Sequence, residues 1–210
     1  MNPLPIEVIL FDLGNVILPF NHRQIPEKLL PFSQEGDLKD SQGIFSYLFD
    51  SQKGTVSLYE SGKISSEEFF GSLRESFRLS LSFEEFVPIW NDIFVENEEV
   101  SEIIRCLKGK KRLGLLSNTN ALHFDYILPK FPIVMAFEKW ILSHEVGFKK
   151  PAPEIFQKAM EWASVEPQRI LFIDDLQKNV DAAVSLGMEA IHFISAGQLK
   201  EALDANLTSP

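Results

Sequence analysis

Five short, continuous apolar runs constrain the fold of this chain more than any other feature. They are Val8–Phe11, Leu113–Leu116, Trp140–Leu142, Ile170–Ile173 and Ala190–Ile194. A run without polar alternation is typical of a β-strand that is covered on both faces. From residue 98 onward the runs alternate with segments of helical periodicity, at about 98–108, 153–163 and 178–186. This alternation predicts an α/β fold with a parallel, doubly wound sheet.

Residues 20–97 follow a different pattern, in which helical periodicity dominates and strand-like runs are absent. Two capping boxes mark the starts of helices: Ser65 with Glu68, and Ser82 with Glu85. Four apolar residues recur at helical spacing and should pack within this unit: Phe69, Phe70, Leu73 and Phe77. The chain therefore forms one strand, continues through a helical unit, and then resumes the sheet.

The simplest organisation is a Rossmann-like core with an inserted α-helical cap domain. We expect residues 1–19 and 98–210 to form the core, and residues 20–97 to form the cap. The 210 residues, 45% of them hydrophobic, are enough for one sizeable core and a smaller inserted unit.

Charge and cysteine content restrict the partners and the compartment. The formal net charge of −10 argues against nucleic acid or an anionic membrane surface as a partner. No apolar run approaches the roughly 20 residues that a membrane helix needs. The single cysteine, Cys106, cannot form an intrachain disulfide and lies among Ile103, Ile104 and Leu107, which predicts a buried structural thiol. We expect a cytoplasmic protein whose partner is a small molecule.

Polar residues follow the apolar runs at the points where ligands bind in open α/β sheets, beyond the carboxyl ends of the strands. In chain order they are Asp12, then Ser117-Asn118, then Lys149-Lys150-Pro151, then Asp174-Asp175. Taken singly, each is an ordinary turn or helix cap. As an ordered set they place carboxylates, a hydroxyl and an ammonium group at one edge of the sheet. This combination indicates a site for phosphate and a metal ion.

The same motifs resemble those of the haloacid dehalogenase-like superfamily, in the subgroup with a helical cap after the first strand. The motifs are Phe11–Val16, Leu116–Thr119, Lys149–Pro151, and Phe172–Asp175 followed by Asn179. The segment Tyr59–Ser65 is similar to the cap of bacterial sugar-phosphate phosphatases such as α-D-glucose-1-phosphate phosphatase. The phosphatase domain of soluble epoxide hydrolase has a similar Asp-Asp ending. The resemblance covers nearly the whole chain.

The resemblance implies a Mg²⁺-dependent phosphatase that acts on a small phosphorylated metabolite such as a sugar phosphate. Asp12 would be the nucleophile and would form an aspartyl-phosphate that water then hydrolyses. The implied ligands of Mg²⁺ are the Asp12 carboxylate, the Gly14 carbonyl and Asp175. Asp174 would support these ligands or act as an additional one.

The resemblance also implies how the phosphoryl group is held. The Ser117 hydroxyl and the Asn118 backbone N–H would donate hydrogen bonds to a phosphate oxygen. Lys150 would neutralise Asp12 and the transferring group. Lys149 competes for this role, but Lys150 directly precedes Pro151, as in the family.

Gly14 departs from the family pattern. Phosphatases of this family usually carry a second aspartate two residues after the nucleophile, where it protonates the leaving group. General acid–base help is worth about 10²–10⁴-fold, so we expect slow turnover of substrates with poor leaving groups. His22 is a candidate replacement, although an exposed linker histidine is the simpler interpretation.

The gap at Gly14 leaves two alternatives open and weakens a third. A metal-independent 2-haloacid dehalogenase also lacks the second aspartate, but Asp174 and Asp175 would then repel its nucleophile and its anionic substrate. A catalytically weak or silent phospho-ligand-binding protein is a second alternative. A phosphomutase is a weaker one, because returning the phosphate needs the missing group. The sequence leaves the oligomeric state open.

Overall fold

Five strands form a single parallel sheet in the computed structural model, which describes residues 4–34, 40–50 and 54–207. The strands are β1 (Val8–Phe11), β2 (Arg112–Ser117), β3 (Lys139–Leu142), β4 (Ile170–Asp174) and β5 (Glu189–His192). Their order in the sheet is β3-β2-β1-β4-β5, and every neighbouring pair is parallel. The predicted α/β class is confirmed. Strand β5 ends at His192, two residues before the end of the apolar run.

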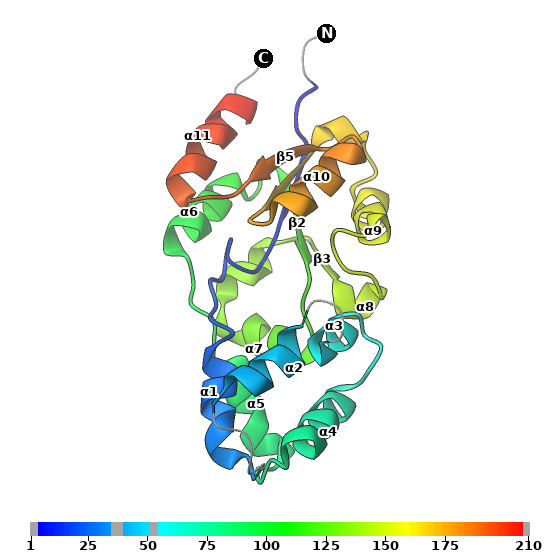
Figure 1. Ribbon diagram of the computed structural model, residues 1–210. Helices are drawn as coiled ribbons and strands as arrows, with labels where there is room; N and C mark the ends of the chain where they lie inside the picture. Colours follow the sequence, from blue (N-terminus) through cyan, green and yellow to red (C-terminus); the bar gives the residue numbers. More distant parts are fainter. Residues whose placement is uncertain (1–3, 35–39, 51–53, 208–210) are drawn as a thin grey trace.

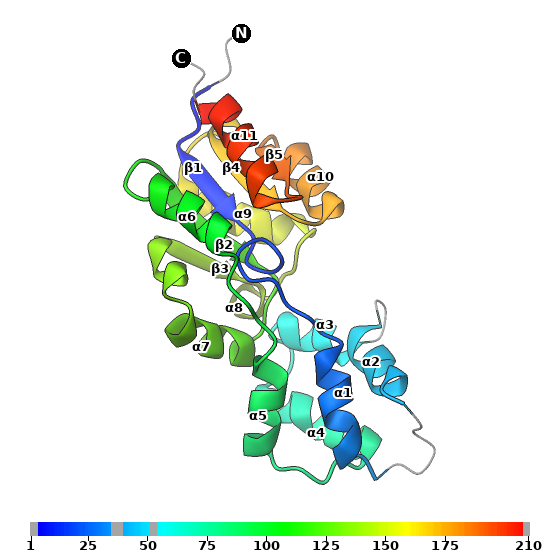
Figure 2. The ribbon, with the colours of Figure 1, turned by 90° about the vertical axis from the view of Figure 1, so that its left-hand side faces the viewer.

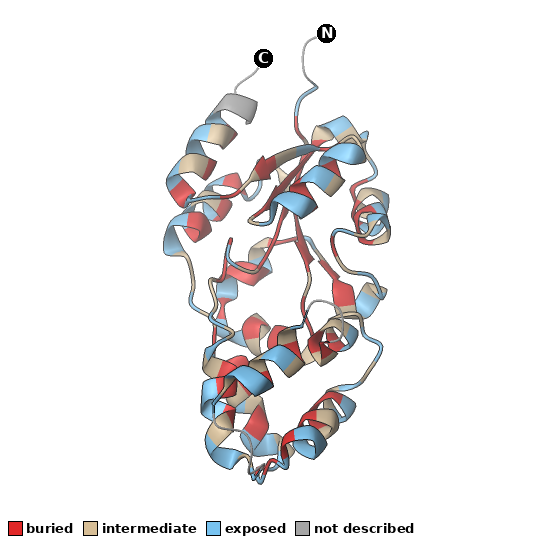
Figure 3. Ribbon diagram, viewed as in Figure 1, coloured by how far each residue is buried: buried red, intermediate tan, exposed pale blue. Residues whose placement is uncertain are grey.

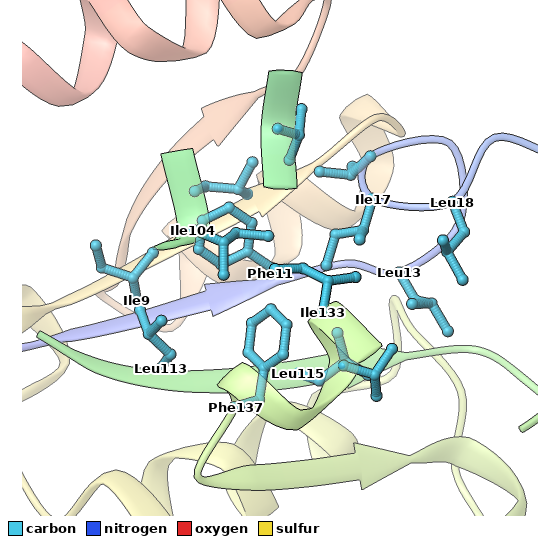
Figure 4. Close-up of a cluster of buried hydrophobic side chains, with 14 of the residues drawn as sticks. Ile9, Phe11, Leu13, Ile17, Leu18, Ile104, Leu113, Leu115, Ile133 and Phe137 are labelled. Carbon is cyan, nitrogen blue, oxygen red and sulfur yellow. The ribbon is translucent and has the colours of Figure 1, made fainter. Parts of the chain in front are cut away.

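Helices cover both faces of this sheet (Figure 1). The helices of this part of the chain are α6 (Glu98–Leu107), α7 (Ala121–Lys130), α8 (Ser143–Val146), α9 (Pro153–Ala163), α10 (Gln177–Ser185) and α11 (Ala196–Leu207), with 3-10 turns at Pro132–Ala136 and Pro167–Arg169. Ile9 and Phe11 of β1 pack in one apolar cluster with α6, α7 and α11, part of which is drawn in Figure 4. Val8 and Leu10 pack in another with α9 and α10. Both faces of β1 are therefore buried, as the continuous apolar run predicts.

All the regular secondary structure described between β1 and α6 is helical. It contains α1 (Gln24–Leu29), α2 (Gln42–Phe49), α3 (Thr55–Glu60), α4 (Ser66–Phe77) and α5 (Phe83–Asn91), with a 3-10 turn at Leu30–Phe32. These helices lie beyond the carboxyl ends of the strands (Figure 2) and bury an apolar cluster of their own. Their buried residues are red in the ribbon of Figure 3. The cluster contains all four apolar residues predicted to pack there.

Both predicted capping boxes are present. Ser65 accepts from the backbone N–H of Glu68, and the Glu68 carboxylate accepts from that of Ser65. Ser82 and Glu85 repeat the arrangement at the start of α5. The division into core and cap domains at residues 19/20 and 97/98 stays a prediction.

The two connections between the sheet and the inserted helices run side by side. The backbone N–H of Asn97 donates to the carbonyl of Ile17 at 2.9 Å, and that of Val95 donates to the carbonyl of Pro19 at 2.9 Å. Phe20 and Phe94 form an antiparallel bridge between the same two segments. The first of these segments follows the loop after β1 and the second precedes α6, so their pairing holds the inserted helices beyond the carboxyl end of β1.

The prediction for Cys106 is wrong, because the side chain is exposed. The buried positions of α6 include Val100, Ile104 and Leu107, which are spaced by four and three residues along one side of the helix. Cys106 lies two residues, or about 200°, from Ile104 and so points away from the core. Among the described residues, the structure contains no helix that is long and apolar enough to cross a membrane.

Candidate active site

Asp12 follows β1, the central strand of the sheet. Its backbone N–H donates to the carbonyl of Ile173 at 2.8 Å, which extends the pairing with β4 by one residue. Its Oδ1 accepts from the Leu13 N–H at 2.7 Å and lies 2.8 Å from Nζ of Lys150. Burial raises the pKa of Asp12 to about 7, against the opposing effect of Lys150 and with a further contribution from Asp174.

Lys150 is the buried cation of the site. Its Nζ lies 2.8 Å from Asp12 Oδ1 and 2.7 Å from Asp174 Oδ2, and it also donates to the carbonyl of Leu116 at 2.8 Å. Burial lowers the pKa of this amine, but the carboxylates of Asp12 and Asp174 outweigh that effect and raise it. Lys149 instead pairs with Glu60 at 3.2 Å. The structure therefore brings Lys150, and not its rival, to the predicted nucleophile.

Two hydrogen bonds between the Asn118 side chain and the Lys150 backbone fix the position of the lysine. The Lys150 N–H donates to Asn118 Oδ1 at 2.8 Å, and Asn118 Nδ2 donates to the Lys150 carbonyl at 3.0 Å. Sequence reasoning assigned only the Asn118 backbone N–H and missed this role of its side chain. The two residues are 32 positions apart, and no local pattern links them.

Ser117 is the last residue of β2 and is buried, with 2% of its surface exposed. Among the described residues, neither its hydroxyl nor the Asn118 backbone N–H has a hydrogen-bond partner. Both donors lie at the carboxyl end of the strand next to β1. They are available to an anionic ligand, and their role in binding phosphate stays a prediction.

The two carboxylates after β4 differ in their surroundings. Asp174 is fully buried and accepts hydrogen bonds from Asn179 Nδ2 at 2.9 and 3.0 Å, and from the Leu176 N–H at 2.8 Å, besides its contact with Lys150. Asp175 is half-buried, and its Oδ2 accepts from Asn15 Nδ2 at 3.1 Å. Burial raises the pKa of Asp175, and the hydrogen bond from Asn15 opposes the rise.

Asn15 was quoted within a motif but given no role. It adopts a left-handed backbone conformation, with φ of 55°, which asparagine tolerates better than most residues. This turn directs its side chain to Asp175.

The acidic residues of this site fit a divalent cation. Oxygens of Asp12, Asp174 and Asp175 all lie within 4.8 Å of one another, close to the roughly 4.2 Å that separates opposite ligands around Mg²⁺. No backbone hydrogen bond to the Gly14 carbonyl is present in the described part of the chain. Oδ1 of Asn179 is buried without a partner there, while its Nδ2 donates to Asp174. Asp174 is already engaged by Lys150 and Asn179, which leaves Asp175 the freer ligand.

The space beside Gly14 is occupied by an aromatic ring. A Cβ atom at Gly14 would lie 2.7 Å from Cε1 of Phe20, so any side chain here must displace that ring. The Phe20 ring packs on His22 with centroids 4.3 Å apart, and His22 stacks on Phe49 of α2 at 4.5 Å and 16°.

His22 is thus half-buried, and the interpretation as an exposed linker histidine is wrong. Burial lowers the pKa of His22 to about 4. The imidazole is neutral near pH 7, so it carries no extra proton to donate to a leaving group.

Comparison with known proteins agrees with this fold. Residues 6–187 match the haloacid dehalogenase-like hydrolase family, and the chain belongs to that family. It is 28% identical to D-ribitol-5-phosphate phosphatase from Bacteroides thetaiotaomicron, over 97% of this chain and 100% of that protein. It is 27% identical to a phosphorylated carbohydrates phosphatase from Thermotoga maritima, over 52% of this chain and 51% of that protein.

Solved structures show the same architecture. A HAD-family enzyme from Bacteroides thetaiotaomicron, in complex with magnesium and inorganic phosphate, superimposes with a TM-score of 0.79 at 29% identity, covering 91% of this chain and 96% of that one. A HAD-like family hydrolase from Porphyromonas gingivalis gives a TM-score of 0.82 at 25% identity, covering 99% and 100%. The predicted family, the fold class and the assignment to the phosphatase class of enzyme are confirmed.

Proposed function

We propose that this chain is a Mg²⁺-dependent phosphomonoester hydrolase that acts on a small sugar or polyol phosphate through an aspartyl-phosphate at Asp12. One observation carries the proposal. The buried Lys150 ammonium bridges Asp12 and Asp174, and the donors of Ser117 and Asn118, which have no partner among the described residues, lie at the carboxyl end of the neighbouring strand. A carboxylate nucleophile, a cation beside it and two free donors are the parts that transfer of a phosphoryl group requires.

In this mechanism Asp12 attacks phosphorus, and the leaving group departs on the opposite side. Lys150 offsets the negative charge that builds up between the carboxylate and the phosphoryl oxygens. Ser117 and the Asn118 N–H hold a phosphoryl oxygen and orient it for in-line attack. Water then hydrolyses the aspartyl-phosphate and regenerates Asp12.

The metal site is part of the proposal. Asp12, the Gly14 carbonyl and Asp175 are the proposed ligands, with Asp174 behind them or as an additional ligand. Bound there, Mg²⁺ would neutralise the charge between the nucleophile and the phosphoryl group. The magnesium and phosphate in the Bacteroides enzyme of the same family support this choice of ion.

The substrate class rests on the relatives and on Gly14. The named relatives act on ribitol 5-phosphate and on phosphorylated carbohydrates. We infer that the inserted helices act as a cap that selects the leaving group above the end of β1. Without an acid at position 14, substrates with better leaving groups, such as anomeric sugar phosphates or aryl phosphates, should be hydrolysed fastest. A cytoplasmic location remains our expectation.

Phosphate release tests the proposal. The substrates are p-nitrophenyl phosphate and a panel of sugar and polyol phosphates, assayed with Mg²⁺ and with EDTA, with Asp12→Asn as the inactive control. We expect release that depends on Mg²⁺ and is lost in Asp12→Asn. No release from any substrate at high enzyme concentration would contradict the proposal. Chloride release from 2-chloropropionate would then separate a dehalogenase from a silent binding protein.

A further inference from the structure

His22 is held between two aromatic rings at the junction of the core and the inserted helices. Phe20, whose ring fills the space beside Gly14, lies on one side with centroids 4.3 Å apart. Phe49 of α2 stacks on the other at 4.5 Å. A continuous series of contacts therefore connects the loop after Asp12 to the inserted helices, through Gly14, Phe20, His22 and Phe49. All three rings are half-buried rather than sealed.

The ring nitrogens of His22 have no hydrogen-bond partner among the described residues. Neither nitrogen is fully buried, so both remain accessible to solvent or to a ligand. The hydrogen-bonding capacity of the imidazole is therefore used by no described residue, although its nitrogens are accessible. A donor and an acceptor held in place by two stacked rings, and left without a protein partner, are available to a ligand.

We propose that His22 is a specificity-determining residue that forms a hydrogen bond with a hydroxyl group of the substrate's leaving group. The inference rests on the proposed phosphatase function and assigns to that site a preference for hydroxylated leaving groups. The position suits this role, because the stack begins at Gly14, two residues after Asp12, and extends toward the inserted helices. We therefore place the leaving group, attached to a phosphoryl group at Asp12, on that path.

The charge state of the ring suits a hydroxyl better than an anion. With its pKa lowered to about 4 by burial, the imidazole is neutral near pH 7. A neutral imidazole offers one donor and one acceptor, which matches the donor and acceptor of a hydroxyl. In this proposal Lys150, Ser117 and Asn118 bind the phosphate group, and His22 contacts the remainder of the substrate.

The test compares two substrates that differ only in hydroxyl groups, D-ribitol 5-phosphate and n-pentyl phosphate. Both have primary alkyl leaving groups on a chain of five carbons. The variant His22→Phe keeps the aromatic stack and removes both nitrogens. We expect the wild-type enzyme to prefer ribitol 5-phosphate. In His22→Phe, kcat/KM for that substrate should fall by roughly 3- to 10-fold, as for loss of one neutral hydrogen bond.

Activity of His22→Phe on n-pentyl phosphate and p-nitrophenyl phosphate should stay within about twofold of the wild type. If all three substrates lose activity equally, His22 has only a structural role. No preference of the wild type for the hydroxylated substrate would also overturn the inference. Complete absence of Mg²⁺-dependent activity on p-nitrophenyl phosphate would instead mean that the proposed function has failed.

Binding provides a second measurement that does not need turnover. The affinity for D-ribitol 5-phosphate is measured by calorimetry with Asp12→Asn and with Asp12→Asn/His22→Phe. We expect weaker binding by the double variant, by the same roughly 3- to 10-fold, with no change for n-pentyl phosphate. Equal affinity of the two variants for ribitol 5-phosphate would contradict the role of His22.

Discussion

The carboxylate of Glu60, at the end of α3, lies 3.2 Å from Nζ of Lys149, the residue before Lys150. Both side chains are mostly buried, with 19% and 24% of their surfaces exposed. Beside this pair, the Leu122 N–H donates to the Tyr59 hydroxyl at 3.1 Å. The inserted helices are thus attached to the core next to Lys150 of the candidate site.

The Glu60–Lys149 pair should therefore affect both stability and turnover. In Glu60→Gln the Lys149 ammonium stays mostly buried without its charge partner, which should lower the free energy of unfolding by about 1–3 kcal/mol. We also expect a lower kcat, because the Lys150 segment is less firmly placed. Urea unfolding and assays with p-nitrophenyl phosphate measure the two effects.

The exposed pair Lys158–Glu161, 2.9 Å apart and within α9, supplies the control for this experiment. Glu161→Gln should cost less than about 0.5 kcal/mol. The charge-swapped variant Glu60→Lys/Lys149→Glu should recover part of the stability that Glu60→Gln loses. A loss in Glu60→Gln no larger than that in Glu161→Gln would refute the interpretation.

Asp12→Asn should abolish turnover and at the same time stabilise the metal-free protein at alkaline pH. The pKa of Asp12 is raised from 3.8 to about 7 on folding, so the folded state binds the proton more tightly than the unfolded state does. Between these pKa values the free energy of unfolding of the wild type falls as pH rises, by up to about 4 kcal/mol in total.

The stabilisation by Asp12→Asn should consequently be larger at pH 8 than at pH 5. Thermal unfolding in EDTA at the two pH values measures it. An equal or larger gain at pH 5 would show that the ionised Asp12 carboxylate does not destabilise the folded chain.

Introducing the missing acid requires space that Phe20 now occupies. Gly14→Asp alone should destabilise the protein by about 1–3 kcal/mol through overpacking, without a gain in activity. With Phe20→Ala in addition, the new carboxyl group has space. The double variant should hydrolyse n-pentyl phosphate at least about tenfold faster than Phe20→Ala, with a smaller effect on p-nitrophenyl phosphate. If the double variant shows no gain over Phe20→Ala, the absent acid does not limit turnover.

His123 should make the protein less stable in acid. Its Nε2 lies 3.1 Å from the carbonyl of Trp90 and its Nδ1 lies 3.0 Å from Nδ2 of Asn120, which suits a neutral ring with the proton on Nε2. Burial lowers the pKa of His123 to about 3, from 6.5. The unfolded chain then binds more protons between these values, so the free energy of unfolding falls as pH falls from 6.5 toward 3.

Urea unfolding at pH 7, 6, 5 and 4 tests this dependence. His123→Gln should be less stable than the wild type at pH 7, because buried partners are lost. Between pH 6.5 and 4 its free energy of unfolding should also fall less steeply than that of the wild type. The two slopes should differ by up to about 1.4 kcal/mol for each pH unit. The His22 imidazole contributes in the same direction, and Asp12 opposes both. Parallel pH profiles for the wild type and His123→Gln would rule out His123 as a source of the acid sensitivity.

The sequence by itself determined the elements and the chemistry at their ends. Continuous apolar runs predicted all five strands, although the edge strands β3 and β5 are only partly buried. Both capping boxes lie where the spacing placed them. These features depend on side-chain periodicity and on hydrogen bonds between residues three positions apart, which a linear pattern contains. The polar residues after β1, β2 and β4 meet because parallel strands bring their carboxyl ends to one edge.

Tertiary structure alone decided the strand order β3-β2-β1-β4-β5, the side of α6 on which Cys106 lies, and the neighbours of the candidate site residues. Phe20 fills the space beside Gly14, Asn118 binds the Lys150 backbone, and Glu60 pairs with Lys149 across 89 positions of the chain. Each of these contacts joins segments whose separation is set by packing of whole helices on the sheet. No local pattern encodes such distances, because they result from the sum of many apolar contacts formed only when the chain is folded.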